Sequence, residues 1–176
     1  MNFTESFIYL SFFFIRRDKI ESLKVQGTDP IYKQNKAQGD LYTAAQPDSK
    51  SFAEFKKMGI KTIINLRGQD EMKFAEEKIV QDQQMKYVHI PVSPATLDLK
   101  TVNEFSQYLA KPENYPILVH CSSANRAATM VALDEIIRNQ QDVEAEIQKA
   151  SQYGITKDAL KDKIREVAAS KDKKAE

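Results

Sequence analysis

The chain has 176 residues, of which 41% are hydrophobic and 29% charged, as is typical of one globular domain with a sizeable core. The net charge of +1 argues against a nucleic-acid partner. One cysteine excludes an internal disulfide, and the two histidines add too few ligands to favour a metal site. A free thiol suits a reducing compartment, so the cytoplasm is the expected location.

The N-terminal segment contains an apolar run, residues 7–15, followed by Arg16 and Arg17. The run is shorter than the roughly 20 residues that a membrane-spanning helix needs. It lacks the preceding basic region and the cleavage site of a signal peptide. We expect a packed segment or an extension, with membrane or partner contact and an atypical export signal as alternatives. The polar residues up to Gly39 are expected to be a linker, so residues 1–37 form a predicted N-terminal extension.

From Asp40 onward, strand and helix patterns alternate along the chain. Apolar and β-branched stretches predict four strands, at residues 41–43, 61–66, 87–90 and 117–120. Helical patterns and capping residues predict six helices, at residues 49–58, 71–83, 100–109, 126–139, 142–153 and 157–169. This order predicts an α/β fold with a four- or five-stranded, mostly parallel sheet flanked by helices. We place the main domain at residues 38–155 and a C-terminal helix with a charged tail at residues 156–176.

Three segments follow the ends of predicted parallel strands, where ligands bind in such sheets. They are residues 67–70, 93–98 and 121–126, and we expect them to converge on one cleft. Arg67 could reach a ligand in that cleft, although a structural salt bridge is the preferred interpretation. His89, within a strand, is interpreted as a structural histidine.

The third segment carries the most chemical information, because it holds the only cysteine in the chain. His120 and Cys121 end an apolar run, and Arg126 opens a helix-favouring run. A thiol between a strand and a helix lies where backbone N–H groups and the helix dipole favour an anion. The same surroundings favour the thiolate form of a cysteine. The segment therefore predicts an anion-binding loop with a built-in nucleophile.

A phosphate ester is a ligand that suits this loop. A thiolate can attack phosphorus and form a phosphocysteine, which water then hydrolyses. Arg126 is predicted to clamp the phosphate with two parallel hydrogen bonds. His120 is expected to orient the loop by hydrogen bonding. The remaining predicted phosphate-binding residues are Ser122, Ser123, Ala124 and Asn125.

The leaving oxygen needs a proton donor, which is usually a carboxylic acid on a neighbouring loop. Asp98 is the first candidate and Asp70 the second. Asp98 could equally cap the helix at residues 100–109. Asp70 and Glu71 could likewise cap the helix at residues 71–83.

An apolar strand is followed by His120 and Cys121, and four residues separate Cys121 from Arg126. This arrangement resembles the active-site loop of the cysteine-dependent protein tyrosine and dual-specificity phosphatases. Residues 39–47, 59–67 and 87–92 are similar to the first three strands of small bacterial phosphatase-like domains. These include the domain attached to β-lactamase-like hydrolases. The resemblance covers residues 38–140. It implies a tyrosine phosphatase-like fold, no cofactor, and hydrolysis of a phosphorylated small molecule or protein, including phosphotyrosine or phosphoserine.

The loop departs from the usual phosphatase pattern at three points. It is one residue shorter than usual, Ala124 stands where bacterial relatives often have glycine, and Ala127 replaces the usual hydroxyl residue after Arg126. Two alternatives therefore stay open. One is a rhodanese-like sulfurtransferase that carries a persulfide on Cys121. The other is a binding module of the same fold that holds phosphate or sulfate without turnover.

Overall fold

The computed structural model describes residues 19–172, so the apolar run at residues 7–15 and the last four residues lie outside its described part. The strands are β1 (Ile20–Leu23), β2 (Ile31–Lys36), β3 (Gly39–Ala44), β4 (Thr62–Asn65), β5 (Lys86–His89) and β6 (Ile117–His120). The helices are α1 (Ser51–Lys57), η1 (Gln69–Glu71), α2 (Glu76–Asp82), α3 (Leu99–Leu109), η2 (Pro112–Asn114), α4 (Asn125–Arg138), α5 (Val143–Ala150) and α6 (Asp158–Asp172).

The six strands form one sheet in the order β1-β2-β3-β6-β4-β5. Strands β3, β6, β4 and β5 are parallel, and β1 and β2 are antiparallel to their neighbours. The predicted mostly parallel α/β sheet is therefore confirmed, with one or two strands more than expected. Strand β6, which leads into the cysteine loop, lies in the interior of the sheet between β3 and β4.

The polar segment before Gly39 is not the linker that the sequence predicts. It supplies β1 and β2, and Tyr32 and Gln34 of β2 pair with Thr43 and Leu41 of β3. The predicted boundary at residue 37 thus falls in the turn of a β-hairpin. The segment lacks a hydrophobic period because a buried position of β2 is occupied by Gln34, which is 0% exposed.

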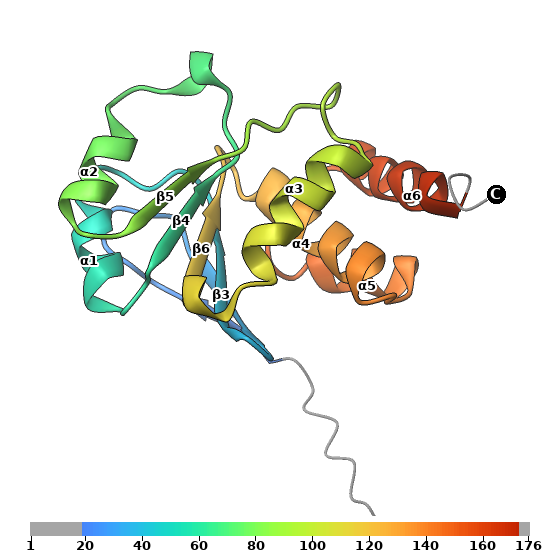
Figure 1. The fold of residues 1–176 in the computed structure, drawn as a ribbon, viewed down its shortest axis with the longest axis horizontal. Helices are drawn as coiled ribbons and strands as arrows, with labels where there is room; N and C mark the ends of the chain where they lie inside the picture. The colour runs from blue at the N-terminus through green and yellow to red at the C-terminus, as the bar shows by residue number, and fades with distance from the viewer. Residues whose placement is uncertain (1–18, 173–176) are drawn as a thin grey trace, which may run out of the picture.

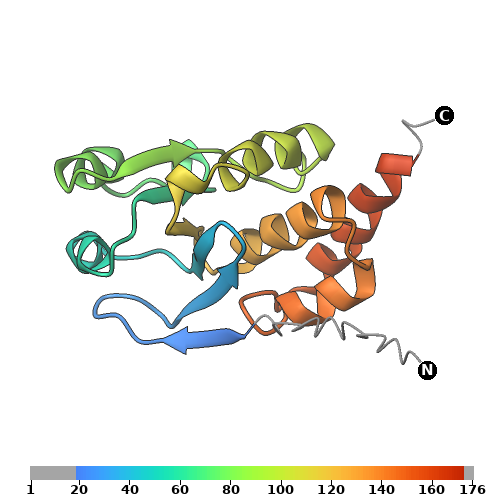
Figure 2. The same ribbon diagram turned by 60° about the horizontal axis from the view of Figure 1, so that its bottom comes forward.

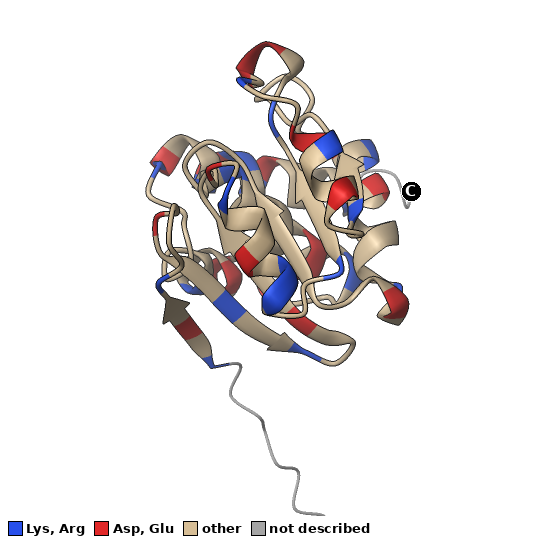
Figure 3. Cartoon of the chain, turned by 90° about the vertical axis from the view of Figure 1, so that its left-hand side faces the viewer, with Lys and Arg blue, Asp and Glu red and all other residues tan. Residues whose placement is uncertain are grey.

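Helices cover both faces of the sheet (Figure 1; Figure 2). Neighbouring residues of a strand point to opposite faces. Ile63 and Leu118 accordingly join the hydrophobic cluster that contains residues of α1, whereas Ile64 and Val119 join the cluster of α3 to α6. On the side presented in Figure 3, basic and acidic segments are interspersed, in keeping with the small net charge.

Helix α6 belongs to the same core as the main domain, although the sequence places it in a separate C-terminal segment. Its residues Ile164 and Val167 are buried in the cluster that contains α4. Ile155, at the predicted boundary, is 2% exposed. Within the described part of the chain, no helix has the length and apolar character to cross a membrane.

Candidate active site

The three strand-end segments converge as predicted, around a cavity of about 640 Å³. The segment after β4 contributes Gly68, Asp70 and Glu71, and α6 and the residue before it add a wall that the sequence does not predict. The other lining residues are Pro91, Val92, Ser93, Pro94, Thr96, Leu97, Ser122, Ser123, Asn125, Arg126, Lys157, Ala159 and Leu160. Cys121 directly follows β6, is 0% exposed and is not among the residues that line this cavity.

The cysteine loop turns into α4 through Ala124, which has a φ of 63°. This left-handed conformation costs a residue with a Cβ atom about 1–2 kcal/mol, which explains why glycine is common at such positions. The carbonyl of Ala124 accepts the hydrogen bond from the N–H of Ala128, 2.9 Å away. The loop therefore holds Ala124 in a strained conformation that glycine would adopt at lower cost.

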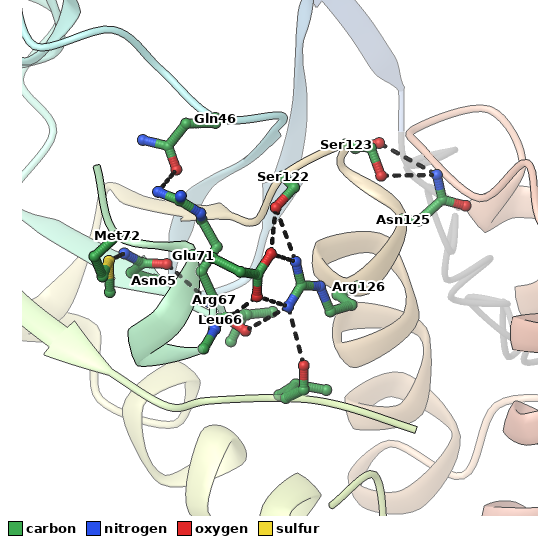
Figure 4. A network of polar contacts seen from close by, with 12 residues as sticks. Gln46, Asn65, Leu66, Arg67, Glu71, Met72, Ser122, Ser123, Asn125 and Arg126 are labelled. Atoms are coloured by element: carbon green, nitrogen blue, oxygen red, sulfur yellow. Dashed lines mark hydrogen bonds and ion pairs between the residues drawn. The ribbon is translucent and has the colours of Figure 1, made fainter. Parts of the chain in front are cut away.

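The segment between α5 and α6 supports this loop from outside the sheet. The side-chain oxygen of Asn125 accepts hydrogen bonds from the backbone N–H groups of Thr156, at 2.9 Å, and Lys157, at 3.2 Å. The Asn125 amide nitrogen donates to the carbonyl of Ser123 at 3.2 Å (Figure 4). A Cβ atom added at Gly154 would lie 2.9 Å from the Cβ atom of Ala124. The sequence analysis gave this segment no role. Gly154 is the one residue that could have indicated its close approach to the cysteine loop.

The guanidinium of Arg126 forms a two-pronged ion pair with Glu71 (Figure 4). Its Nη1 and Nη2 atoms lie 2.7 and 2.6 Å from the two carboxylate oxygens. Glu71 also accepts hydrogen bonds from the hydroxyl of Ser122, at 2.6 Å, and the backbone N–H of Gly68, at 2.7 Å. The Nη1 atom further donates to the carbonyls of Leu66 and Val92. The arginine is thus held by η1 and by backbone carbonyls that follow β4 and β5.

The predicted helix at residues 71–83 begins later, because α2 starts at Glu76. Glu71 is instead the last residue of the short helix η1, and its side chain caps that helix by accepting from the N–H of Gly68. The hydrogen bond from Arg126 keeps the pKa of Glu71 well below its usual range, although burial acts in the opposite direction. The same pair raises the pKa of Arg126, and the charge of Cys121 contributes to that rise. The sulfur therefore lies within electrostatic reach of the guanidinium.

The two candidate acids lie in different places. Asp98 is the N-cap of α3, and its Oδ1 atom accepts from the N–H of Thr101 at 2.9 Å. That hydrogen bond lowers the pKa of Asp98, whereas a proton donor must hold its proton. Asp98 is also not among the residues that line the cavity, whereas Asp70 lines it. The structure therefore favours the capping alternative for Asp98.

His120, the last residue of β6, belongs to a buried polar network. Its Nε2 atom is 2.8 Å from Oε1 of Glu76, and the two side chains are 0% and 1% exposed. Glu76 also accepts from Asn65 and Gln46, both at 2.9 Å. Sequence reasoning missed Glu76, because a glutamate at the start of a helix is ordinary and gives no signal of burial.

The two remaining candidates have structural partners. Arg67 is 4% exposed, and its Nη1 atom donates to the side-chain oxygen of Gln46 at 2.5 Å. The preferred salt bridge is thus replaced by a hydrogen bond to an amide (Figure 4). His89 lies 2.7 Å from the carbonyl of Arg67 through its Nε2 atom, in agreement with a structural histidine.

The parallel sheet and the Cys–Arg loop between β6 and α4 define a phosphatase-like protein of the tyrosine and dual-specificity class. A family model described as "DSP-PTPase phosphatase fused to NAD+ Kinase" matches residues 18–167, and the chain belongs to that family.

Relatives and solved structures agree with this assignment. A β-lactamase hydrolase-like protein of Xylella fastidiosa is 30% identical over 102 residues, which are 55% of this chain and 23% of that protein. The match thus spans about a quarter of the curated relative. A DUF442 protein from Shewanella putrefaciens has a TM-score of 0.57 and 25% identity over 83% of this chain and 93% of that one. A cysteine-to-serine variant of P. aeruginosa TpbA in complex with phosphotyrosine has a TM-score of 0.58 and 17% identity. The match covers 86% of this chain and 98% of that one.

Proposed function

We propose that the protein hydrolyses phosphate monoesters, with Cys121 as the nucleophile and Arg126 as the phosphate clamp. The observation that carries this proposal is that Cys121 directly follows β6 and begins the segment whose residues Ser122, Ser123, Asn125 and Arg126 line the cavity. Loop N–H groups and a guanidinium match the charge on the three equatorial oxygens of a transferring phosphoryl group. Membership of the phosphatase family supports the same chemistry.

The reaction proceeds in two displacements. The Cys121 thiolate attacks phosphorus, so an S–P bond forms while the bond to the ester oxygen breaks. Asp70, which lines the cavity, gives its proton to the leaving oxygen. Water then attacks the phosphocysteine, Asp70 takes up a proton from that water, and inorganic phosphate leaves with the thiolate restored.

The walls of the cavity favour a substrate with an apolar group beside the phosphate. The segment after β5 contributes Pro91, Val92, Pro94 and Leu97, and Leu160 of α6 adds another apolar side chain. An aryl phosphate fits such walls better than a sugar phosphate does, because burial of apolar surface is favourable. The phosphotyrosine complex of TpbA supports an aryl phosphate as the first probe.

The test is hydrolysis of p-nitrophenyl phosphate by the full chain, with and without vanadate. We expect turnover that vanadate inhibits and that Cys121→Ser abolishes, with circular dichroism confirming that the variant is folded. A wild-type protein that binds phosphate but turns over no aryl phosphate, phosphopeptide or nucleotide would contradict the proposal and indicate a binding module. Sulfur transfer from thiosulfate to cyanide would contradict it in favour of a sulfurtransferase.

A further inference from the structure

Lys157 is a cavity residue to which the proposed reaction gives no role. The charged residues that line the cavity are Asp70, Glu71, Arg126 and Lys157. Glu71 and Arg126 form an ion pair with each other, and Asp70 is the proposed proton donor to the leaving oxygen. Lys157 is therefore a positive charge of the cavity that is left over for another part of a substrate.

Hydrogen bonds to Asn125 fix where Lys157 lies relative to the cysteine loop. The backbone N–H groups of Thr156 and Lys157 donate to the side-chain oxygen of Asn125 at 2.9 and 3.2 Å. Asn125 directly precedes Arg126, so the backbone of the lysine lies one side chain away from the residue before the proposed phosphate clamp. The side chain of Lys157 is exposed and lines the cavity. The lysine is thus placed to meet the part of a substrate that lies beside the phosphate.

The ammonium of Lys157 has no acidic partner in the described part of the chain. The neighbouring acid, Asp158, pairs instead with Lys161, whose Nζ atom lies 2.8 Å from its carboxylate. Further along the same helix, Lys163 and Arg165 also pair with acidic side chains. The charge of Lys157 therefore stays available to an anion that enters the cavity.

Helix stability does not explain a lysine at this place. Lys157 directly precedes α6, and the start of a helix carries a partial positive charge that disfavours a cation. Serine, threonine, aspartate and asparagine are the residues preferred there. Asp98 and Asp142 occupy the equivalent positions before α3 and α5, and each caps its helix. A residue that conflicts with its local preference is expected mainly at functional sites, which favours a ligand-binding role for Lys157.

The surroundings of Lys157 favour an anion that is carried on an apolar group. Ala159 and Leu160 of α6 and Leu97 after β5 line the same cavity. The attraction between opposite charges grows as water is replaced by less polar surroundings. An ammonium acts as a point charge, so it suits a carboxylate and a phosphate alike. The cavity therefore suits a substrate whose phosphate and second anionic group are separated by an apolar part.

We propose that Lys157 is a specificity-determining residue that binds a second anionic group of the substrate, a carboxylate or a phosphate. The inference rests on the proposed function, because it concerns which phosphate monoester the site selects. Its test measures binding to the full chain carrying Cys121→Ser, which lacks the proposed nucleophile and so leaves the ester intact. A wild-type protein without turnover would overturn the proposed function and leave this test of Lys157 intact.

The experiment determines dissociation constants by isothermal titration calorimetry. The anionic probes are carboxyphenyl phosphate and phenylene bisphosphate, each as the meta and the para isomer, and the neutral reference is carbamoylphenyl phosphate. We expect Lys157→Gln to weaken binding of at least one anionic probe about fivefold, equivalent to about 1 kcal/mol, the upper end for an exposed ion pair. Binding of the neutral reference should change less than about twofold. The anionic probe with the larger loss identifies the preferred group.

Two further variants separate direct contact from a general charge effect. Lys161→Gln is the matched control, because Lys161 lies on the same helix, pairs with Asp158 and does not line the cavity. It should leave every dissociation constant within about twofold. Lys157→Arg keeps the charge and should keep the preference for the anionic probe, which also shows that the site tolerates substitution. An equal loss for anionic and neutral probes in Lys157→Gln would overturn the proposal, as would no loss for any anionic probe or the same selective loss in Lys161→Gln.

Discussion

Glu71 holds both terminal nitrogens of Arg126, at 2.6 and 2.7 Å, and so joins the short helix η1 to the loop after β6. The carboxylate is itself held by the hydroxyl of Ser122 and the N–H of Gly68. With its terminal nitrogens fixed in this way, the guanidinium has one orientation relative to the cavity. This pair therefore determines which edge of the arginine a bound anion meets.

Loss of this pair should reduce stability in a pH-dependent way. The folded-state pKa of Glu71 is lowered, so its stabilisation is fully present above the unfolded value of about 4.3 and is lost as the pH falls below it. We expect Glu71→Gln to cost about 1 kcal/mol at pH 7, the upper end for partly exposed ion pairs. Urea unfolding of both proteins at pH 7 and pH 3 should show a smaller difference at pH 3. An equal difference at the two pH values would contradict this assignment.

Replacement of Arg126 by lysine should impair the phosphate site although the positive charge is kept. Lysine lacks the planar guanidinium whose orientation Glu71 fixes, so we expect kcat/KM for p-nitrophenyl phosphate to fall about 100-fold or more. Binding of inorganic phosphate should weaken as well. Arg138→Lys is the matched control, because Arg138 ends the same helix and pairs with Asp134. Similar losses in both variants would count against the clamp.

The two candidate acids can be separated by their leaving-group dependence. Asp70→Asn should lower kcat/KM, which reports the first displacement, about 100-fold for phenyl phosphate, whose leaving oxygen needs a proton. The loss should be much smaller for p-nitrophenyl phosphate, whose leaving group departs as a stable anion. Asp98→Asn should leave both rates within about twofold of wild type, since asparagine also caps helices well. A leaving-group-dependent loss in Asp98→Asn alone would reverse the assignment.

Gly154 should tolerate no larger residue, because its φ is +138° and an added Cβ atom would lie 3.0 Å from the carbonyl oxygen of Ala124. We expect Gly154→Ala to reduce the free energy of unfolding by about 2 kcal/mol and to weaken phosphate binding. Gly59→Ala isolates the conformational cost. Gly59 has a φ of +83°, and no described atom lies within 4 Å of the added Cβ. That control should lose about 1 kcal/mol and bind phosphate normally.

Local pattern was enough to predict the parallel strands, most clearly β4 and β6, which are short runs buried at every position. It also predicted the cysteine loop, whose residues are adjacent in the sequence. It failed for β2, where Gln34 occupies a fully buried position. That strand is specified by its antiparallel pairing with β3, which the sequence of either segment alone does not show.

The supporting residues of the site were missed for a related reason. Glu71 and Glu76 lie 55 and 44 residues before their partners Arg126 and His120. Acidic residues in the first turn of a helix are common for electrostatic reasons, so their identity carries no sign of a distant partner. Asp98 illustrates the converse, because its capping role is local and was among the alternatives that the sequence offered.

The hydrogen bonds from Thr156 and Lys157 to Asn125 also bear on how the molecule forms. Strand β6 needs partners from both earlier parts of the sheet, and the loop after it needs contacts from some 30 residues further along the chain. Contacts between distant parts of a sequence form slowly, and during synthesis they must await the later residues. The cysteine loop therefore cannot make these contacts until residues 156 and 157 have been added, and a nascent chain carries the Cys121 thiol before the loop has this support.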